Sequence, residues 1–166
     1  GKPNSFLLES VEGGAVRGRY SIIGLSPDLI WRCHGNAAEI NRNAETNPDG
    51  YEACQPGALE SLRQVVDESR IELPENLPPM ASGLFGYMGY DSVRLSEDIP
   101  DNNPDDLGVP DGLFLRPSLI CIFDRLEDIV TIITPVWPVK GISHEAAYET
   151  AKTRLNDAIT DFQRSL

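Results

Sequence analysis

The amino-acid sequence predicts an α+β fold made mainly of antiparallel β-sheets flanked by helices. Apolar runs of β type follow one another in groups, joined by short connections that are typical of hairpins. Helical periodicity is confined to two segments, residues 57–71 and 143–166. Strand and helix patterns do not alternate along the chain, which argues against a doubly wound parallel sheet.

The N-terminal quarter predicts an antiparallel meander. Four apolar segments are expected to be its strands: residues 5–10, 19–24, 29–34 and 37–41. Gly35-Asn36 between the last two is a two-residue hairpin signal. Ser26-Pro27-Asp28 is expected to separate the second strand from the third.

A helix is expected over residues 57–71, before the proline-rich stretch 73–79 that would end it. Five residues at helical spacing form its predicted buried face: Leu59, Leu62, Val65, Val66 and Ser69.

Glycines at 83, 86 and 89 stand among aromatic residues in the segment 82–91. This pattern predicts a strand that passes close to another backbone or to a ligand. A short helix is expected at 91–95, and the acidic, proline-rich residues 97–111 are expected to form a surface loop.

The C-terminal part predicts a hairpin of residues 119–123 and 129–134, followed by a helix over 143–166 with Ser143 as its N-cap. The apolar stripe of this helix is expected to pack on the sheets or on further chain. Its members are Ala147, Ala151, Leu155, Ala158, Ile159, Phe162 and Leu166.

Composition limits the classes of function. The 166 residues have ordinary globular composition, and residues 1–166 are taken as one domain. The formal net charge of -12 argues against nucleic acid and anionic membranes as partners. The sequence has no apolar run long enough to span a bilayer. Its three cysteines form no Cys-x-x-Cys pair, so free thiols and no zinc site are expected, which suits the cytoplasm.

No catalytic or metal-binding constellation is recognisable. The two histidines, His34 and His144, are expected at the surface. The glycines of 83–89 do not match a dinucleotide fingerprint, and the acidic run 98–111 does not match a calcium loop. We therefore assign no catalytic residue, no metal ligand and no cofactor to this segment.

Polar residues interrupt the first two strands in a way that suits an amino-acid ligand. Glu9-Ser10 ends one strand and Arg19 opens the next. An amino acid needs a donor for its carboxylate, an acceptor for its ammonium group and an apolar slot for its side chain. A plain Glu–Arg surface pair explains the same residues, and spacing alone favours that alternative.

Four segments, in order along the chain, resemble the N-terminal region of anthranilate synthase component I, a family of chorismate-utilising enzymes. They are Leu7-Leu8-Glu9-Ser10 with residues 19–24, residues 83–91 with Arg94, residues 103–108 with Pro110-Asp111, and Phe123-Asp124. Together they cover most of residues 5–135. The resemblance implies that residues 1–166 are a fragment of a longer chain and form the N-terminal part of the family's β-sandwich.

The resemblance also implies a function. The family converts chorismate, with ammonia or glutamine and with magnesium, to anthranilate and pyruvate for tryptophan biosynthesis. The ammonia usually comes from a glutamine amidotransferase partner. Chorismate and magnesium are bound by a C-terminal domain that residues 1–166 do not include, so this segment alone is expected to be inactive.

By the same resemblance, Leu8, Glu9 and Ser10 hold the feedback inhibitor L-tryptophan, and Arg19 stands where relatives place a basic residue near it. The remaining contacts to tryptophan would come from the C-terminal domain. Three alternatives stay open: the sister branches that make aminodeoxychorismate for folate or isochorismate, a stand-alone amino-acid-binding module, and a purely structural domain.

Overall fold

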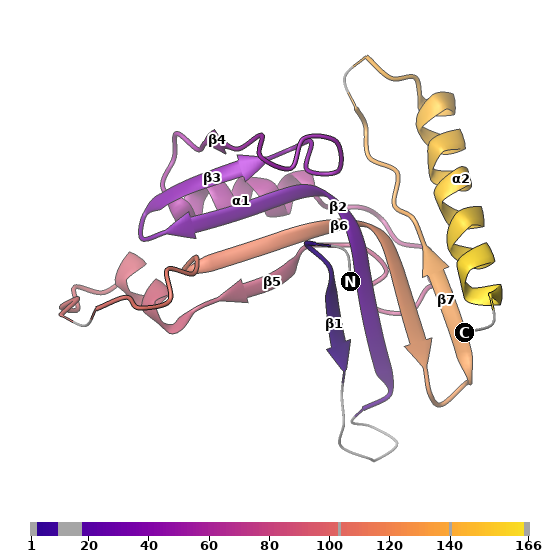
Figure 1. Ribbon diagram of the computed structural model, residues 1–166, viewed down its shortest axis with the longest axis horizontal. Helices are drawn as coiled ribbons and strands as arrows, with labels where there is room; N and C mark the ends of the chain where they lie inside the picture. Colours follow the sequence, from indigo (N-terminus) through magenta and orange to yellow (C-terminus); the bar gives the residue numbers. More distant parts are fainter. Residues whose placement is uncertain (1–2, 10–17, 103, 140, 165–166) are drawn as a thin grey trace. The chain divides into compact units, whose positions relative to one another are not determined.

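The computed structural model describes residues 3–9, 18–102, 104–139 and 141–164. Its seven strands form a single antiparallel sheet that is accompanied by two α-helices and one 3-10 helix, so the predicted α+β class is confirmed (Figure 1). The strands are β1 Phe6–Glu9, β2 Tyr20–His34, β3 Ala37–Asn41, β4 Glu52–Ala53, β5 Phe85–Met88, β6 Gly112–Asp124 and β7 Ile129–Ile133. The helices are α1 Ala58–Glu68, the 3-10 helix η1 Tyr90–Leu95 and α2 His144–Gln163.

The long strands β2 and β6 are central to the sheet. Its order is β4-β3-β2-β6-β5, with β1 also paired to β2 and β7 also paired to β6. The chain divides into two compact units, and both strands contribute to each. The first unit is drawn from residues 1–27, 72–82 and 117–166, and the second from 28–71 and 83–116. The predicted domain of residues 1–166 therefore comprises two units.

One predicted break is wrong, because β2 continues through Ser26-Pro27-Asp28. Ser26 has a positive φ of 50°, yet the strand does not end there. The pairing of β1 with β2 stops at Gly24, and that of β3 with β2 begins at Ile30. Pro27 therefore removes no hydrogen bond to β1 or β3, and a proline is tolerated in the strand.

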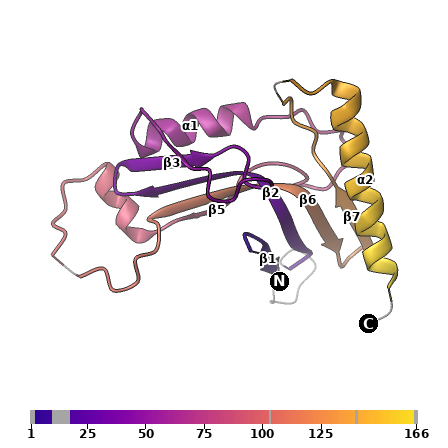
Figure 2. The same cartoon turned by 45° about the horizontal axis from the view of Figure 1, so that its top comes forward.

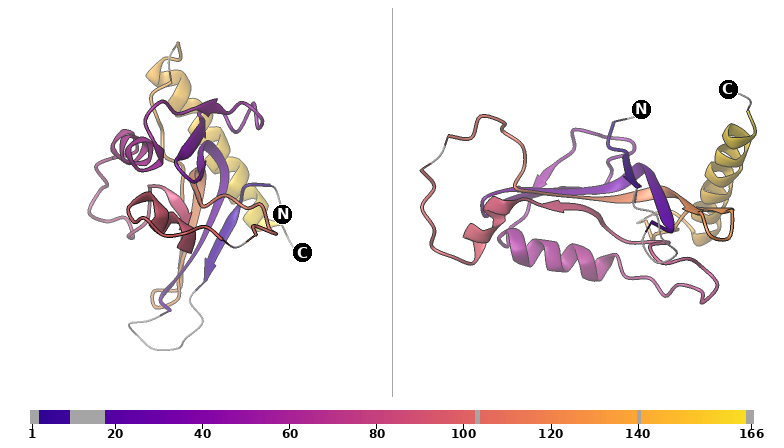
Figure 3. Two further views of the ribbon diagram at one scale, coloured as in Figure 1. Left: turned by 90° about the vertical axis from the view of Figure 1, so that its left-hand side faces the viewer. Right: turned by 90° about the horizontal axis from the view of Figure 1, so that it is seen from below.

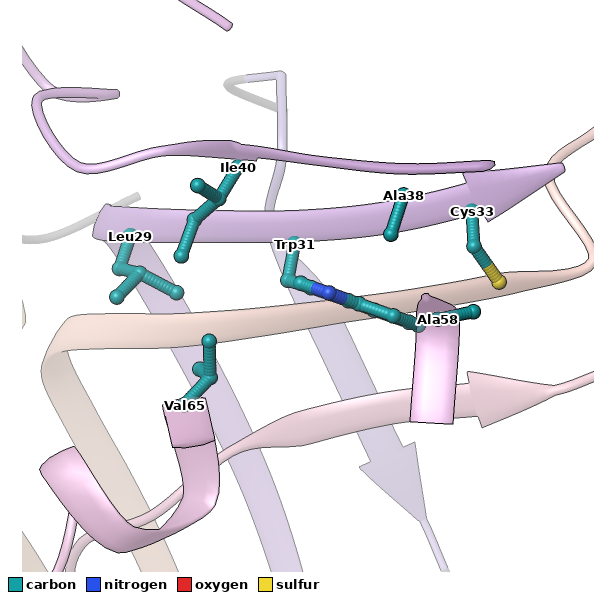
Figure 4. Packing of buried hydrophobic residues seen from close by; sticks show 7 residues of the cluster. All are labelled: Leu29, Trp31, Cys33, Ala38, Ile40, Ala58 and Val65. Atoms are coloured by element: carbon teal, nitrogen blue, oxygen red, sulfur yellow. The ribbon is translucent and has the colours of Figure 1, made fainter. Parts of the chain in front are cut away.

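The core of the second unit is built around Trp31 of β2, which is completely buried. Its indole Nε1 donates to the Ser61 hydroxyl of α1 at 3.0 Å. Figure 4 shows Trp31 between the strands and Ala58 of the helix. The cluster of buried residues comprises Leu29, Trp31, Cys33, Ala38, Ile40, Ala58 and Val65. Burial also raises the pKa of the Cys33 thiol, as expected for a structural cysteine.

Helix α1 lies along one face of the strands of the second unit (Figure 3), and its predicted buried face is confirmed in part: Val65 and Ser69 are buried and Leu62 packs against the core. Leu59 and Val66 are exposed by 36% and 42%, whereas Ala58 and Ser61 are buried. The reason is the bulk of Trp31, because small side chains let the helix approach the indole and Ser61 satisfies its N–H. A local hydrophobic pattern does not contain this long-range constraint.

The close approach predicted for the glycine-rich segment is confirmed in β5. Gly86 is paired with Phe114 of β6. A Cβ atom at Gly86 would lie 1.9 Å from the carbonyl oxygen of Leu113. The neighbour is thus another backbone, and only glycine fits at this position.

The first unit contains β1, β7, α2 and the adjoining parts of β2 and β6. Helix α2 lies beside β7 (Figure 2), and Ala158 packs with Leu119 and Cys121. The predicted N-cap is confirmed, since the Ser143 hydroxyl accepts a hydrogen bond from the Ala146 N–H at 3.2 Å. The predicted hairpin is confirmed too, although β6 starts at Gly112 because β5 pairs with its first residues.

Candidate functional site: a charged hollow beside β1

The pairing of β1 with β2 sets the first side of the candidate site. Leu7 lies opposite Ile23, and Glu9 lies opposite Ser21. Residues that face each other across an antiparallel pair project to the same side of the sheet, and so do residues two apart. These four side chains therefore share one face.

The β6–β7 hairpin closes the other side of a hollow of about 370 Å³, and all the lining residues belong to the first unit. From β1 and β2 the lining residues are Leu7, Glu9, Ser21 and Ile23. From the hairpin they are Phe123, Asp124, Arg125, Asp128, Ile129 and Val130. The hollow thus combines an apolar wall with groups of both charges, which is the composition expected of a site for a small zwitterion.

Arg125 provides a cation at the hollow. Its Nη2 donates to Oε1 of Glu9 at 3.0 Å and lies 3.5 Å from the Ser21 hydroxyl. The side chains of Arg125 and Glu9 are 53% and 48% exposed. An ion pair this open to water contributes little to stability, so both partners remain accessible to a ligand.

Arg19 is engaged elsewhere. Its Nε lies 2.9 Å from both carboxylate oxygens of Asp124, and its Nη2 lies 2.5 Å from Oδ2. Oδ1 of Asp124 also accepts hydrogen bonds from the backbone N–H groups of Leu126 and Glu127. The Arg19 guanidinium, with these two N–H groups, lowers the pKa of the Asp124 carboxyl from 3.8 to about 2. Arg19 thus anchors the turn of the hairpin.

This ion pair predicts a pH dependence. Because the pKa of Asp124 is lower in the folded chain than its ordinary value of 3.8, its carboxylate stabilises the fold above about pH 4. That stabilisation is lost as the pH falls from about 4 through about 2. In an Arg19→Ala variant the pKa of Asp124 is expected to rise towards 3.8, which a carboxyl-carbon NMR titration would measure.

Arg63→Ala is the matched control for this titration, since the contact of Arg63 within the described part of the chain is an exposed pair with Glu60 one helical turn away. The Arg63→Ala variant should leave the pKa of Asp124 unchanged. An unchanged pKa of Asp124 in Arg19→Ala would show that the backbone N–H groups, and not Arg19, set its value.

The structure brings only part of the predicted site together. Glu9 lines the hollow. Leu8 is paired with Ile22, half exposed, and lies on the strand face opposite Leu7 and Glu9. Ser10 lies outside the described residues. Arg19 does not line the hollow and pairs with Asp124.

Arg125 is a residue of the hollow that was not among the predicted site residues. It lies 116 positions from Glu9, in the turn predicted at 124–128. No local pattern joins a hairpin turn to so distant a strand. The available signal was a cation directly after Phe123-Asp124, the last of the four resembling segments.

A second hollow, of about 630 Å³, lies within the second unit, between the β2–β3 turn, η1 and the loop that follows η1. Its four lining aspartates are Asp91, Asp101, Asp105 and Asp111. Arg94, which also lines it, pairs with Asp91 and Asp101. Within the described ranges, no group of three or more His, Cys, Asp or Glu side chains is placed to hold a metal ion.

His34 and His144 are both exposed, as predicted. The helices of the described segments include none with the length and apolar character needed to cross a membrane.

Comparison with known proteins finds similarity to proteins named anthranilate synthase component 1. No family model matches the chain. The chain is 47% identical over 164 residues to anthranilate synthase component 1 of Cereibacter sphaeroides, a match that covers 99% of the chain and 33% of that relative. It is 34% identical over 168 residues to the protein of the same name from Pseudomonas putida, covering 99% of the chain and 32% of the relative. The chain thus spans about a third of the length of these curated relatives.

A solved structure shares the fold. The crystal structure of anthranilate synthase component I from Streptococcus pneumoniae matches with a TM-score of 0.64, over 95% of this chain and 32% of that one. The sequence identity in this match is 20%, so the likeness supports the architecture alone.

Proposed function

Because the chain belongs to the anthranilate synthase component I family, as its N-terminal part, we propose that it is the regulatory, non-catalytic portion of that enzyme and contributes part of an L-tryptophan feedback site. The observation that carries the proposal is the hollow beside β1, where Glu9 of the Leu-Leu-Glu-Ser segment meets a cation and an apolar wall. Ser10, Leu8 and Arg19 are the other residues of the proposed set. Leu8 and Arg19 do not line the hollow, and Arg19 contributes through the hairpin turn that its pair with Asp124 anchors.

In this proposal the complete polypeptide converts chorismate, with glutamine or ammonia, to anthranilate and pyruvate in the cytoplasm. Its remaining part binds chorismate and magnesium, and a glutamine amidotransferase component supplies ammonia. Residues 1–166 contribute no catalytic group. The rise in anthranilate fluorescence after chorismate is added to the full-length polypeptide tests the parent activity, whereas an aminodeoxychorismate product would place the chain in the sister branch.

The chemistry of the hollow suits the inhibitor. The ammonium group of an amino acid needs an anion, which Glu9 offers, and an indole needs apolar surface, which Leu7, Ile129 and Val130 offer. Tryptophan inhibits if it binds one global arrangement of the enzyme better than another while chorismate has the opposite preference. A site to which two parts of the polypeptide contribute meets this requirement, because ligand binding stabilises one arrangement of the parts.

Substitution of Ser10 tests the proposal in the full-length polypeptide. Removing one hydrogen bond to a charged group weakens binding by roughly 10-fold or more. The tryptophan concentration for half-inhibition is therefore expected to rise by about that factor in Ser10→Ala, and further in Ser10→Phe because the ring would fill the site. Inhibition is measured as the fraction of each variant's own uninhibited rate.

Ser96→Ala serves as the control, because the Ser96 hydroxyl is exposed and donates to the Val93 carbonyl at the end of η1, within the second unit. Its half-inhibition should equal that of the unsubstituted enzyme. Identical inhibition curves for Ser10→Ala, Ser10→Phe and the unsubstituted enzyme would reject the assignment of the Leu-Leu-Glu-Ser segment to tryptophan.

A further inference from the structure

We propose that Arg125 is the carboxylate-binding residue of the hollow beside β1, and that an α-amino acid enters by replacing the Glu9–Arg125 ion pair with two pairs of its own. The inference rests on the proposed function and adds to it a residue outside the Leu-Leu-Glu-Ser segment.

The choice between the two arginines near β1 follows from their partners. Arg19 uses Nε and Nη2 on Asp124, whose side chain is only 13% exposed. Turning Arg19 towards a ligand would leave a mostly buried carboxylate without its cation, which is costly. Among the described residues, Arg125 loses an exposed ion pair with Glu9 and a long contact of 3.5 Å with the Ser21 hydroxyl when it turns, and an exposed pair contributes little.

Arg125 is held in place by its backbone, and its side chain is left accessible. Its backbone N–H donates to the carbonyl oxygen of Arg19 at 3.0 Å. A single guanidinium nitrogen, Nη2, makes both side-chain contacts, to Glu9 and to Ser21. A guanidinium carries five N–H donors in a planar fork, so Arg125 has the capacity for a two-point contact with a carboxylate.

The two charges of the ligand are opposite to those of Glu9 and Arg125, the two residues whose ion pair it would replace. Its ammonium group pairs with Glu9, its carboxylate pairs with Arg125, and the Ser21 hydroxyl is placed to add a second donor. Glu9 and Arg125 each keep a partner of opposite charge in this exchange. A ligand that lacks the carboxylate would pair with Glu9 and leave Arg125 without an anion. The Glu9–Arg125 pair therefore favours binding of the zwitterion over binding of the amine.

The test compares L-tryptophan with tryptamine, which lacks only the carboxylate, by calorimetric titration of the full-length polypeptide. In Arg125→Ala the Kd of tryptophan is expected to rise by roughly 10-fold to 100-fold, as for the loss of hydrogen bonds to a charged group. The Kd of tryptamine is expected to stay the same or fall, because Glu9 no longer has a competing cation. The preference for tryptophan over tryptamine should therefore largely disappear.

Two further variants sharpen the result. Arg125→Lys keeps the charge without the planar fork, so its Kd for tryptophan should lie between those of the unsubstituted protein and Arg125→Ala. Arg63→Ala, which removes an exposed arginine of α1, should change the Kd of neither ligand.

An equal loss of affinity for both ligands in Arg125→Ala would overturn the inference, because it would mean that Arg125 only supports the fold of the hairpin. Unchanged affinity for both would overturn it too, since the carboxylate would then bind elsewhere. If Ser10 variants lose tryptophan sensitivity while Arg125→Ala binds normally, the proposed function stands and this inference fails. If the unsubstituted protein binds no tryptophan, both fail.

Discussion

Replacing Trp31 by alanine is expected to lower the free energy of unfolding by about 3–5 kcal/mol, the range found when a fully buried aromatic side chain is removed from a core. Trp31 is completely buried, and its ring centroid lies 6.1 Å from that of Phe114. The substitution also leaves the Ser61 hydroxyl without the indole donor. Both changes occur in the cluster that holds α1 against β2 and β3.

Urea denaturation followed by far-UV circular dichroism measures this loss. Trp31→Phe is the matched control, because it keeps an aromatic ring and removes the N–H. Its cost should be smaller, about 1–3 kcal/mol, because the buried Ser61 hydroxyl loses one donor but still donates to the Ala58 carbonyl, and the ring is smaller. A loss below about 1 kcal/mol in Trp31→Ala would mean that the strands and α1 hold together without the indole.

Substituting Gly86 by alanine is expected to be the next most damaging change. The added Cβ atom would lie 1.9 Å from the Leu113 carbonyl oxygen and 2.7 Å from the Cα atom of Phe114. Both are backbone atoms, so no side chain can rotate away and β5 must separate from β6. We expect a loss of about 3 kcal/mol or more, at the upper end of the cost of overpacking.

Gly35→Asn is the matched control for Gly86→Ala, because a Cβ atom at Gly35 meets no other atom within 4 Å. Its positive φ of 53° is one that asparagine tolerates. Gly35→Asn should therefore shift the urea midpoint much less than Gly86→Ala. Equal midpoints for the two variants would contradict the role assigned to the β5–β6 contact, and loss of protected amide hydrogens in β5 alone would support it.

Local features of the fold were predictable because their causes lie close together in sequence. The Gly35-Asn36 hairpin, the Ser143 cap of α2 and the close backbone approach of the 83–89 segment each follow from a few adjacent residues. The continuity of β2 through Pro27 did not follow, because it depends on where β1 and β3 stop pairing.

The same division applies to the buried face of α1. Helical spacing placed Leu59 and Val66 inside, yet the partner across the interface is the large indole of Trp31. Which side of an amphipathic helix is buried depends on the shape of what it meets. That shape comes from a strand 30 positions earlier in the chain.

By itself, the sequence determined the α+β class and most of the strands and helices, and through a family resemblance it made Glu9 a candidate ligand-binding residue. Only the tertiary structure decided which cation faces Glu9. Arg19 and Arg125 are both basic residues in the sequence. In the structure Arg19 pairs with Asp124, whereas Arg125 pairs with Glu9 at the hollow. The physical reason is that charge pairing depends on distance in space, and the sheet brings together residues that lie more than a hundred positions apart.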